Sequence, residues 1–234
     1  VDLLVEDDVN RANILSNEVE FLNQNRRRIE KDVVNEALKQ IDNDRFTNIV
    51  YGEGWNQGVL GIVASRIIER SYKPTIVMTE SNEHILTGSV RSVKDYDVYQ
   101  SLSDCEDNIL QYGGHKYAAG LKIKKTNFDI FKNQFEDIVK DSVGQKMFKR
   151  SFSYDLLIDF SELTIENVKI IRRMAPFGLG NKRPVFRTNN CFIDSKLKFL
   201  GKEEQVVKSK IKDKNGSQLP FICFDKKSEL VDLE

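Results

Sequence analysis

The chain has 234 residues, which is long for one compact domain and comfortable for two. Its 40% hydrophobic content can form buried cores, and its 31% charged content is typical of a water-facing protein. No run approaches the ~18 apolar residues of a membrane helix, and no signal peptide opens the chain, so we expect no membrane association. The chain begins at Val1 without an initiator Met, and we expect it to be a piece of a longer protein.

The formal charge is zero, with 36 basic and 36 acidic residues, but the charges are not evenly spread. Between Lys169 and Lys214 there are thirteen Lys or Arg residues against four Asp or Glu. A basic stretch in a neutral protein indicates a local contact with a polyanion. The alternative is a row of solvated lysines that protects a sheet edge.

The three cysteines, Cys105, Cys191 and Cys223, are far apart, form no CxxC pair and have no nearby His. This pattern excludes a recognisable zinc motif and favours buried free thiols in a reducing cytoplasm.

Residues 8–41 are predicted to form one long helix, because apolar residues recur at three- and four-residue steps and no Gly or Pro interrupts them. Such a helix is about 50 Å long, more than a small domain needs. Its apolar stripe is too irregular for sustained heptads, so we interpret residues 1–45 as a connector between domains. A connector of this kind favours a monomer.

Residues 46–145 alternate between strand and helix patterns and predict an α/β sheet domain. The expected strands are 48–51, 75–78, 85–90 and 121–124, and the expected helices are 58–70, 99–102, 104–111 and 128–143. Residues 144–150 are expected to be a linker.

Residues 151–234 are mostly strand-forming. Strands are expected at 152–160, 185–188, 191–200, 205–212 and 219–224, with one helix at 165–174 and a hairpin turn at Asn215-Gly216. Five strands and one helix in about 80 residues suit a small barrel such as an OB-fold, an architecture that commonly binds single-stranded nucleic acid.

Three motifs in residues 46–145 are candidates for chemistry. The first runs from Gly113-Gly114-His115 to Ala118-Ala119-Gly120. Its paired glycines allow close approach of a ligand to the backbone, and His115 can donate a hydrogen bond to a phosphate. The alternative is a helix cap followed by a tight turn.

The second motif is Ser89-Val90-Arg91-Ser92, in which strand alternation puts Ser89 and Arg91 on one face. A guanidinium beside hydroxyl groups suits a phosphate, whereas the alternative is a strand end with a surface salt bridge. The third motif, Trp55 to Ala64, is a glycine-bounded turn into a closely packed helix, and the helix N-terminus can help to bind an anion.

Together the three motifs resemble the DHH-associated domain of RecJ exonucleases and of their DHH-phosphoesterase relatives. The family pattern contains Trp-His-x-Gly-Val-Ile-Gly-Ile-Val-Ala-Ser-Arg, then Ser-x-Arg-Ser, then Gly-Gly-His-x-x-Ala-Ala-Gly. This chain departs from it at Asn56, where the family usually has His. Residues 174–186 resemble the RecJ signature Ala-Pro-Phe-Gly-x-Gly-Asn-x-x-Pro-x-Phe, which opens the OB-fold domain of that family.

The resemblance implies a DHH-associated α/β domain followed by an OB-fold barrel. It implies an enzyme that degrades single-stranded DNA from the 5′ end with Mn²⁺ or Mg²⁺ and acts in repair and recombination, with a helicase and a single-strand-binding protein as partners. The metal ligands of the family lie in an N-terminal domain with an Asp-His-His motif, which this chain lacks. We therefore expect this chain to bind no metal and to be inactive alone.

The resemblance also assigns site residues. Ser89, Arg91, Ser92, Gly113, Gly114 and His115 are expected to hold substrate and phosphate. Lys182, Arg183 and Arg187 are expected to contact nucleic acid from the barrel. Two rival functions are a phosphoesterase for short oligonucleotides or cyclic dinucleotides, and a non-enzymatic nucleic-acid-binding module.

Overall fold

The computed structural model describes residues 2–82, 84–144, 148–201 and 206–224. The chain divides into two compact units, which we call unit 1 (residues 1–150) and unit 2 (residues 151–234). No helix among the described residues is both long and apolar enough to cross a membrane.

Unit 1 is built on a five-stranded sheet with the order β1-β2-β3-β5-β4. Its strands are β1 (Asn48–Tyr51), β2 (Thr75–Asn82), β3 (Ile85–Arg91), β4 (Gln111–His115) and β5 (Ala118–Lys124). Strands β1 and β2 are parallel, and the other neighbours are antiparallel. The predicted α/β sheet domain is therefore confirmed.

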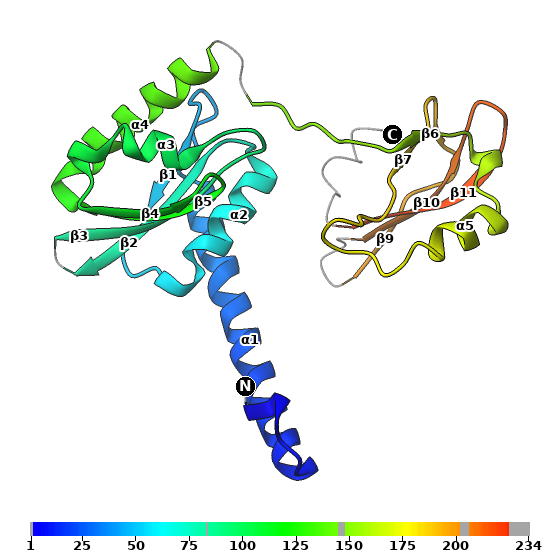
Figure 1. Cartoon of the computed structure of the whole chain (residues 1–234), viewed down its shortest axis with the longest axis horizontal. Coiled ribbons are helices and arrows are strands. Elements are labelled where there is room, and N and C mark those ends of the chain that lie inside the picture. The colour runs from blue at the N-terminus through cyan, green and yellow to red at the C-terminus, as the bar shows by residue number, and fades with distance from the viewer. Residues whose placement is uncertain (1, 83, 145–147, 202–205, 225–234) are drawn as a thin grey trace. The chain divides into compact units, whose positions relative to one another are not determined.

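Helices cover both faces of this sheet (Figure 1). They are α1 (Val9–Leu38), α2 (Leu60–Arg70), α3 (Val98–Ser103) and α4 (Phe128–Val143), with 3₁₀ turns at Asp2–Leu4, Gln57–Val59, Glu106–Asn108 and Lys125–Asn127. Alternation along the strands separates two cores. Val50 and Val77 pack with α1 and α2, whereas Ile49 and Ile76 pack with α3 and α4.

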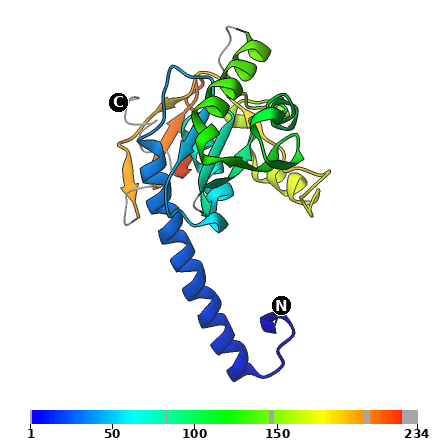
Figure 2. The ribbon, with the colours of Figure 1, turned by 90° about the vertical axis from the view of Figure 1, so that its left-hand side faces the viewer.

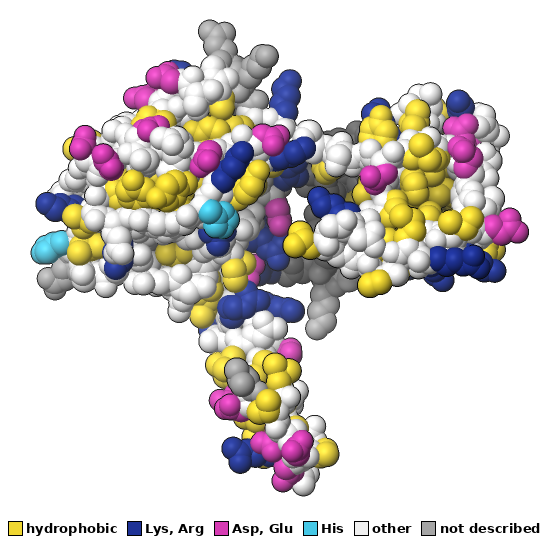
Figure 3. Space-filling view, in the orientation of Figure 1, with side chains coloured by type: hydrophobic (Ala, Val, Ile, Leu, Met, Phe, Trp, Pro, Cys, Tyr) yellow, Lys and Arg dark blue, Asp and Glu magenta, His cyan; other side chains and the backbone are white. Residues whose placement is uncertain are grey.

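Helix α1 is confirmed as a long helix, but only its last turns belong to the core. Val33, Val34 and Ala37 are buried against α2, whereas the first half projects away from the sheet (Figure 2). Hydrophobic and charged side chains are mixed along this projecting part (Figure 3). The C-terminal end of the helix therefore belongs structurally to unit 1.

The predicted helix at 104–111 is wrong. Only Glu106–Asn108 form a 3₁₀ turn, and Leu110 already donates its backbone N–H to the carbonyl of Lys122 at 2.8 Å. Residues 111–115 then form β4. Pairing with β5 outweighs the local helical pattern because Gly113 and Gly114 disfavour a helix.

Unit 2 contains the helix α5 (Ile165–Arg172), a 3₁₀ turn at Phe160–Glu162 and six strands. Strands β8 (Phe192–Ile193), β9 (Lys198–Leu200), β10 (Val206–Lys212) and β11 (Gln218–Phe224) form one sheet, and β6 (Leu156–Leu157) pairs with β7 (Phe186–Arg187). The Asn215-Gly216 hairpin is confirmed, with Gly216 at a φ of 88°. Of the expected strand at 152–160 only β6 forms.

The strand-rich character of unit 2 is confirmed, but a closed barrel is not seen. Among the described residues, β6 and β7 pair only with each other and the four other strands form a separate sheet. Closure needs a continuous ring of paired strands, and this ring is interrupted between the two sheets.

Candidate functional site

The first motif forms a β-hairpin rather than a helix cap or a loop. Gly113, Gly114 and His115 lie on β4, and they pair with Gly120, Ala119 and Ala118 of β5. Only Lys116 and Tyr117 connect the two strands. The motif is therefore part of the sheet, and its side chains are fixed by strand register.

The glycines of this hairpin differ in what they do for the fold. Gly114 has a φ of 149°, and an added Cβ would lie 2.4 Å from the carbonyl oxygen of Ala118, so the backbone requires glycine there. A Cβ on Gly113 would meet nothing within 4 Å, and one on Gly120 would meet only the Gly88 carbonyl at 3.7 Å. Gly113 and Gly120 thus leave free space above the sheet.

The second motif lies beside the first across β5. Ser89 pairs with Gly120, which pairs with Gly113, and Arg91 pairs with Ala118, which pairs with His115. Directly paired residues of antiparallel strands share one face. Ser89, Arg91, Gly113, His115, Ala118 and Gly120 therefore lie on one face of the sheet, which we call the open face.

The guanidinium of Arg91 is held in place on this face. Its Nη1 donates to the hydroxyl of Ser89 at 3.0 Å and to the carbonyl of Val90 at 2.8 Å. Both side chains are half-buried, whereas Gly113, His115 and Gly120 are exposed. The arrangement presents an ordered cation beside a flat, accessible floor.

The third motif supports this cation from α2. A Cβ on Gly61 would lie 2.5 Å from Nη2 of Arg91 and 3.1 Å from Oγ of Ser89, so the helix meets both side chains at Gly61. Trp55 is buried, and its indole N–H donates to Glu36 at 2.8 Å. Asn56 caps the preceding turn by accepting the N–H of Gly58 at 2.8 Å.

Ser92 is separated from the other expected phosphate ligands in its bonding. Its hydroxyl donates to the carbonyl of Tyr96 at 2.8 Å, and its backbone N–H donates to the carbonyl of Tyr117 at 3.0 Å. Val98 donates to the carbonyl of Lys116 in the same way, at 3.1 Å. Ser92 therefore ties the end of β3 to the tip of the hairpin.

The expected contacts of unit 2 are all exposed. Lys182 and Arg183 precede β7, and Arg187 lies in it. The guanidinium of Arg183 lies 5.4 Å from the ring centre of Phe177, and that of Arg187 lies 5.3 Å from Tyr154. Phe177 and Phe186 are only partly buried, which weakens their expected role as core residues.

The acidic clusters act in chain geometry. Asp8 caps α1 by accepting the N–H of Asn10 at 2.8 Å, as expected of a charge that starts a helix. In the part of the chain that the structure describes, no three His, Cys, Asp or Glu residues are grouped to hold a metal ion. The residues present therefore do not fit a metal centre.

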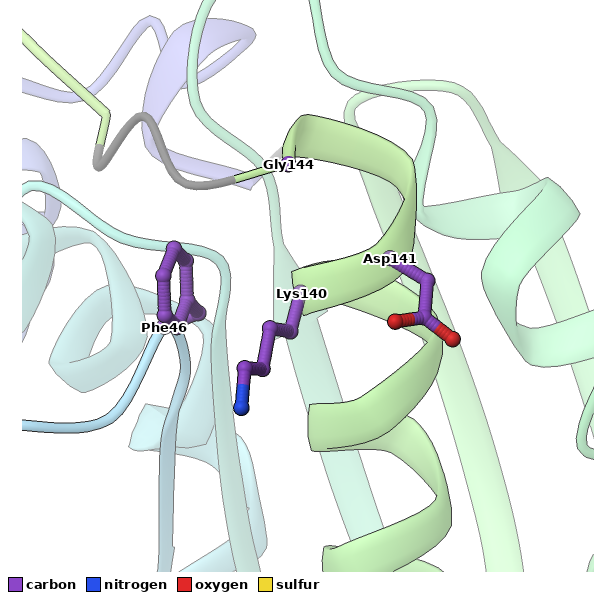
Figure 4. A pocket seen from close by; sticks show the side chains of 4 residues that line it. All are labelled: Phe46, Lys140, Asp141 and Gly144. Carbon is purple, nitrogen blue, oxygen red and sulfur yellow. The ribbon is translucent and has the colours of Figure 1, made fainter.

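The thiols differ from expectation. Cys105 is buried, but Cys191 is exposed and Cys223 is intermediate. Burial, and secondarily the charge of Asp104, raises the pKa of Cys105 to about 12. A pocket lined by Phe46, Lys140, Asp141 and Gly144 lies at the C-terminal end of α4 and includes none of the motif residues (Figure 4).

Sequence reasoning did not assign Gly61 or Gly120 to the site. Gly61 was read as a packing residue, and its contact with Arg91 depends on where α2 crosses β3. Gly120 carried a usable signal, because strand alternation from Ala118 places it beside Ser89 once β5 is paired with β3.

Comparison with known proteins agrees with this geometry. Residues 30–141 match the model of the DHHA1 domain, and residues 154–234 match that of the RecJ OB domain. The chain belongs to the RecJ family. The DHHA1 match includes the last turns of α1, in agreement with their burial in unit 1.

Curated relatives span the same two domains of RecJ. The single-stranded-DNA-specific exonuclease RecJ of Bacillus subtilis is 30% identical over 97% of this chain, and that of Haemophilus influenzae is 30% identical over 94%. The chain spans only 29% and 40% of the length of these two proteins.

Solved structures of RecJ share the fold. The crystal structure of Thermus thermophilus RecJ in complex with Mg²⁺ has a TM-score of 0.78 and 26% identity, and it covers 97% of this chain and 34% of its own. The corresponding complex with Mn²⁺ also has a TM-score of 0.78.

Proposed function

We propose that this chain is the substrate-binding part of a RecJ-like 5′-to-3′ single-stranded-DNA exonuclease that acts in DNA repair and recombination. The observation that carries the proposal is the meeting of three motifs on the open face of unit 1. Arg91 is fixed there beside a floor without side chains, and His115 lies two strands away in the same row.

The open face suits a phosphate of the DNA backbone. Arg91 offers a rigid set of donors, Ser89 adds a hydroxyl, and His115 adds a ring N–H. Gly113 and Gly114 bring the backbone of β4 close to the strand. Ser92 contributes by holding the hairpin tip rather than by donating its hydroxyl proton.

Unit 2 is proposed to add sequence-independent contacts to the strand. Lys182, Arg183 and Arg187 are exposed, and two of them stack on aromatic rings, which orders their guanidinium groups. Such contacts are electrostatic and therefore sensitive to salt.

Hydrolysis is assigned to a part of the whole protein beyond this chain, with Mn²⁺ or Mg²⁺ as the metal that activates water. The whole protein is proposed to be cytoplasmic and monomeric and to cooperate with a helicase and a single-strand-binding protein. Helix α1 is proposed to connect unit 1 to the catalytic part.

The test is binding of a fluorescent oligothymidine by the full chain, with Arg91→Ala compared against Arg70→Ala, an exposed arginine at the end of α2. We expect Arg91→Ala to weaken binding by about tenfold, since hydrogen bonds to charged groups contribute about 1.5–3 kcal/mol. Arg70→Ala should have little effect. Equal effects of the two variants would contradict the assignment of the open face.

A further inference from the structure

The lysines of β10 do not guard a sheet edge. β10 pairs along its whole length with β11, and on its other side it pairs with β8 and β9. Lysines that prevent edge-to-edge association lie on edge strands. The edge explanation for this part of the basic stretch is therefore excluded, and another reason for the lysines is needed.

Strand alternation gathers these lysines on one face. Lys208, Lys210 and Lys212 share it, and Lys198 of β9 pairs directly with Lys208. The opposite face of β10 carries Val207, which is fully buried. Within the described residues none of these four lysines has a recorded ion pair. Asp194 borders the row, and its carboxylate accepts a hydrogen bond from Gln218.

Exposed apolar side chains flank the lysines on the same face. Phe192 pairs with Lys212 and is 62% exposed, and Ile222 pairs with Lys208 and is 47% exposed. Phe224 and Leu200 both pair with Val206 and are 68% and 42% exposed. We call the surface formed by Lys198, Lys208, Lys210, Lys212, Phe192, Ile222 and Phe224 the lysine face.

The chemistry of this face selects its partner. Protein interfaces are depleted of lysine at their centres, because a buried unpaired ammonium group is costly. Single-stranded nucleic acid instead combines a charged backbone with bases that expose flat π-faces. Lysines two residues apart on a strand lie about 7 Å apart, a spacing suited to successive nucleotides of an extended strand.

We propose that the lysine face binds single-stranded DNA, with the backbone running along β10 and bases stacking on Phe192 and Phe224. The inference rests on the proposed function, since the strand bound here is its substrate. It assigns the contact to residues other than Lys182, Arg183 and Arg187.

The test is titration of the full chain with fluorescent oligothymidine at several salt concentrations. The double variant Lys208→Gln/Lys210→Gln is compared with Lys169→Gln/Lys214→Gln, which removes the same charge from exposed sites on α5 and in the β10–β11 turn. We expect the first variant to reduce the slope of log affinity against log salt by about 1.4, because each phosphate contact contributes about 0.7 for single strands. The control should keep the wild-type slope.

Phe192→Ala tests stacking separately from charge. It should weaken binding at least about fivefold and leave the salt slope unchanged. Because all substituted side chains are exposed or nearly so, circular dichroism should show the native fold in each variant.

Three outcomes would overturn the inference. If both double variants lose the same slope, the effect is one of net charge. If neither loses slope while Arg91→Ala still weakens binding, the lysine face carries no DNA and the proposed function of the open face stands. If the wild-type chain binds no single strand, both proposals fall.

Discussion

Arg91 lies directly against the backbone of Gly61, so closely that a Cβ at position 61 would stand 2.5 Å from its Nη2. The contact joins α2 to the end of β3 and leaves the guanidinium one resting place. The glycine thus sets the position of a charged group that belongs to a different motif.

Gly61→Ala should separate this positioning from folding. Alanine favours a helix over glycine by up to about 1 kcal/mol, and the clash falls on the flexible end of Arg91. We expect the free energy of unfolding to stay unchanged or to rise slightly, while affinity for single-stranded DNA falls toward that of Arg91→Ala. Ser65→Ala, one turn later on α2, is the control. Chemical denaturation and anisotropy measure the two quantities, and a loss of stability without a loss of affinity would oppose the model.

The two glycines of the hairpin should respond differently to alanine. Gly114→Ala forces a side chain into a φ of 149° and against Ala118, and it should cost at least about 1–3 kcal/mol of unfolding free energy. Gly113→Ala enters open space and should change stability by no more than about 0.5 kcal/mol. Its methyl group points onto the open face, so it should weaken DNA binding. Equal stability losses in urea denaturation would argue against this distinction.

Thiol labelling should distinguish Cys191 from Cys105. At pH 8 in the folded chain, the exposed Cys191 should react with a thiol reagent while the buried Cys105 stays protected. Denaturant should expose Cys105. Cys191→Ser should remove the fast phase, and rapid modification of Cys105 in the native state would contradict its burial.

The stability of the chain should also fall at alkaline pH because of Cys105. Its folded pKa of about 12 lies above the ordinary value of 9.0, so the folded state keeps a proton that the unfolded state releases. The stabilisation is complete below pH 9 and is lost as the pH rises from 9 toward 12. Cys105→Ala should show a flatter decline over that range in denaturation experiments at fixed temperature.

The chain alone should not degrade DNA. Single-stranded DNA labelled at its 5′ end and incubated with the pure chain and Mn²⁺ should remain intact. Metal-dependent degradation that disappears when one of the chain's own carboxylates is replaced would show that this expectation is wrong.

Much of unit 1 could be predicted from sequence, because its apolar residues repeat with clear periods. The bounds of β1 and α4 match the expected ones, and β3 differs by one residue. The helix expected at 104–111 failed for a tertiary reason. The pairing of Gln111–His115 with β5 satisfies backbone groups that a short, glycine-ended helix would leave exposed to water.

Unit 2 was less predictable because its strands are short and two of its sheets share no pairs among the described residues. Alternation within 206–212 was readable, but its meaning was not. Whether a lysine row is an edge guard or a binding surface depends on which strands flank it, and this is a property of long-range pairing.

The sequence by itself determined the family, the two-unit organisation and the residue types of the site, since these depend on local motifs and hydrophobic periods. Only the tertiary structure decided which of those residues meet. Strand register places Ser89 beside Gly120 and Gly113, and Arg91 in the row of His115, while it turns the hydroxyl of Ser92 to the carbonyl of Tyr96. Register is set by pairing between segments distant in the chain, so no local pattern contains it.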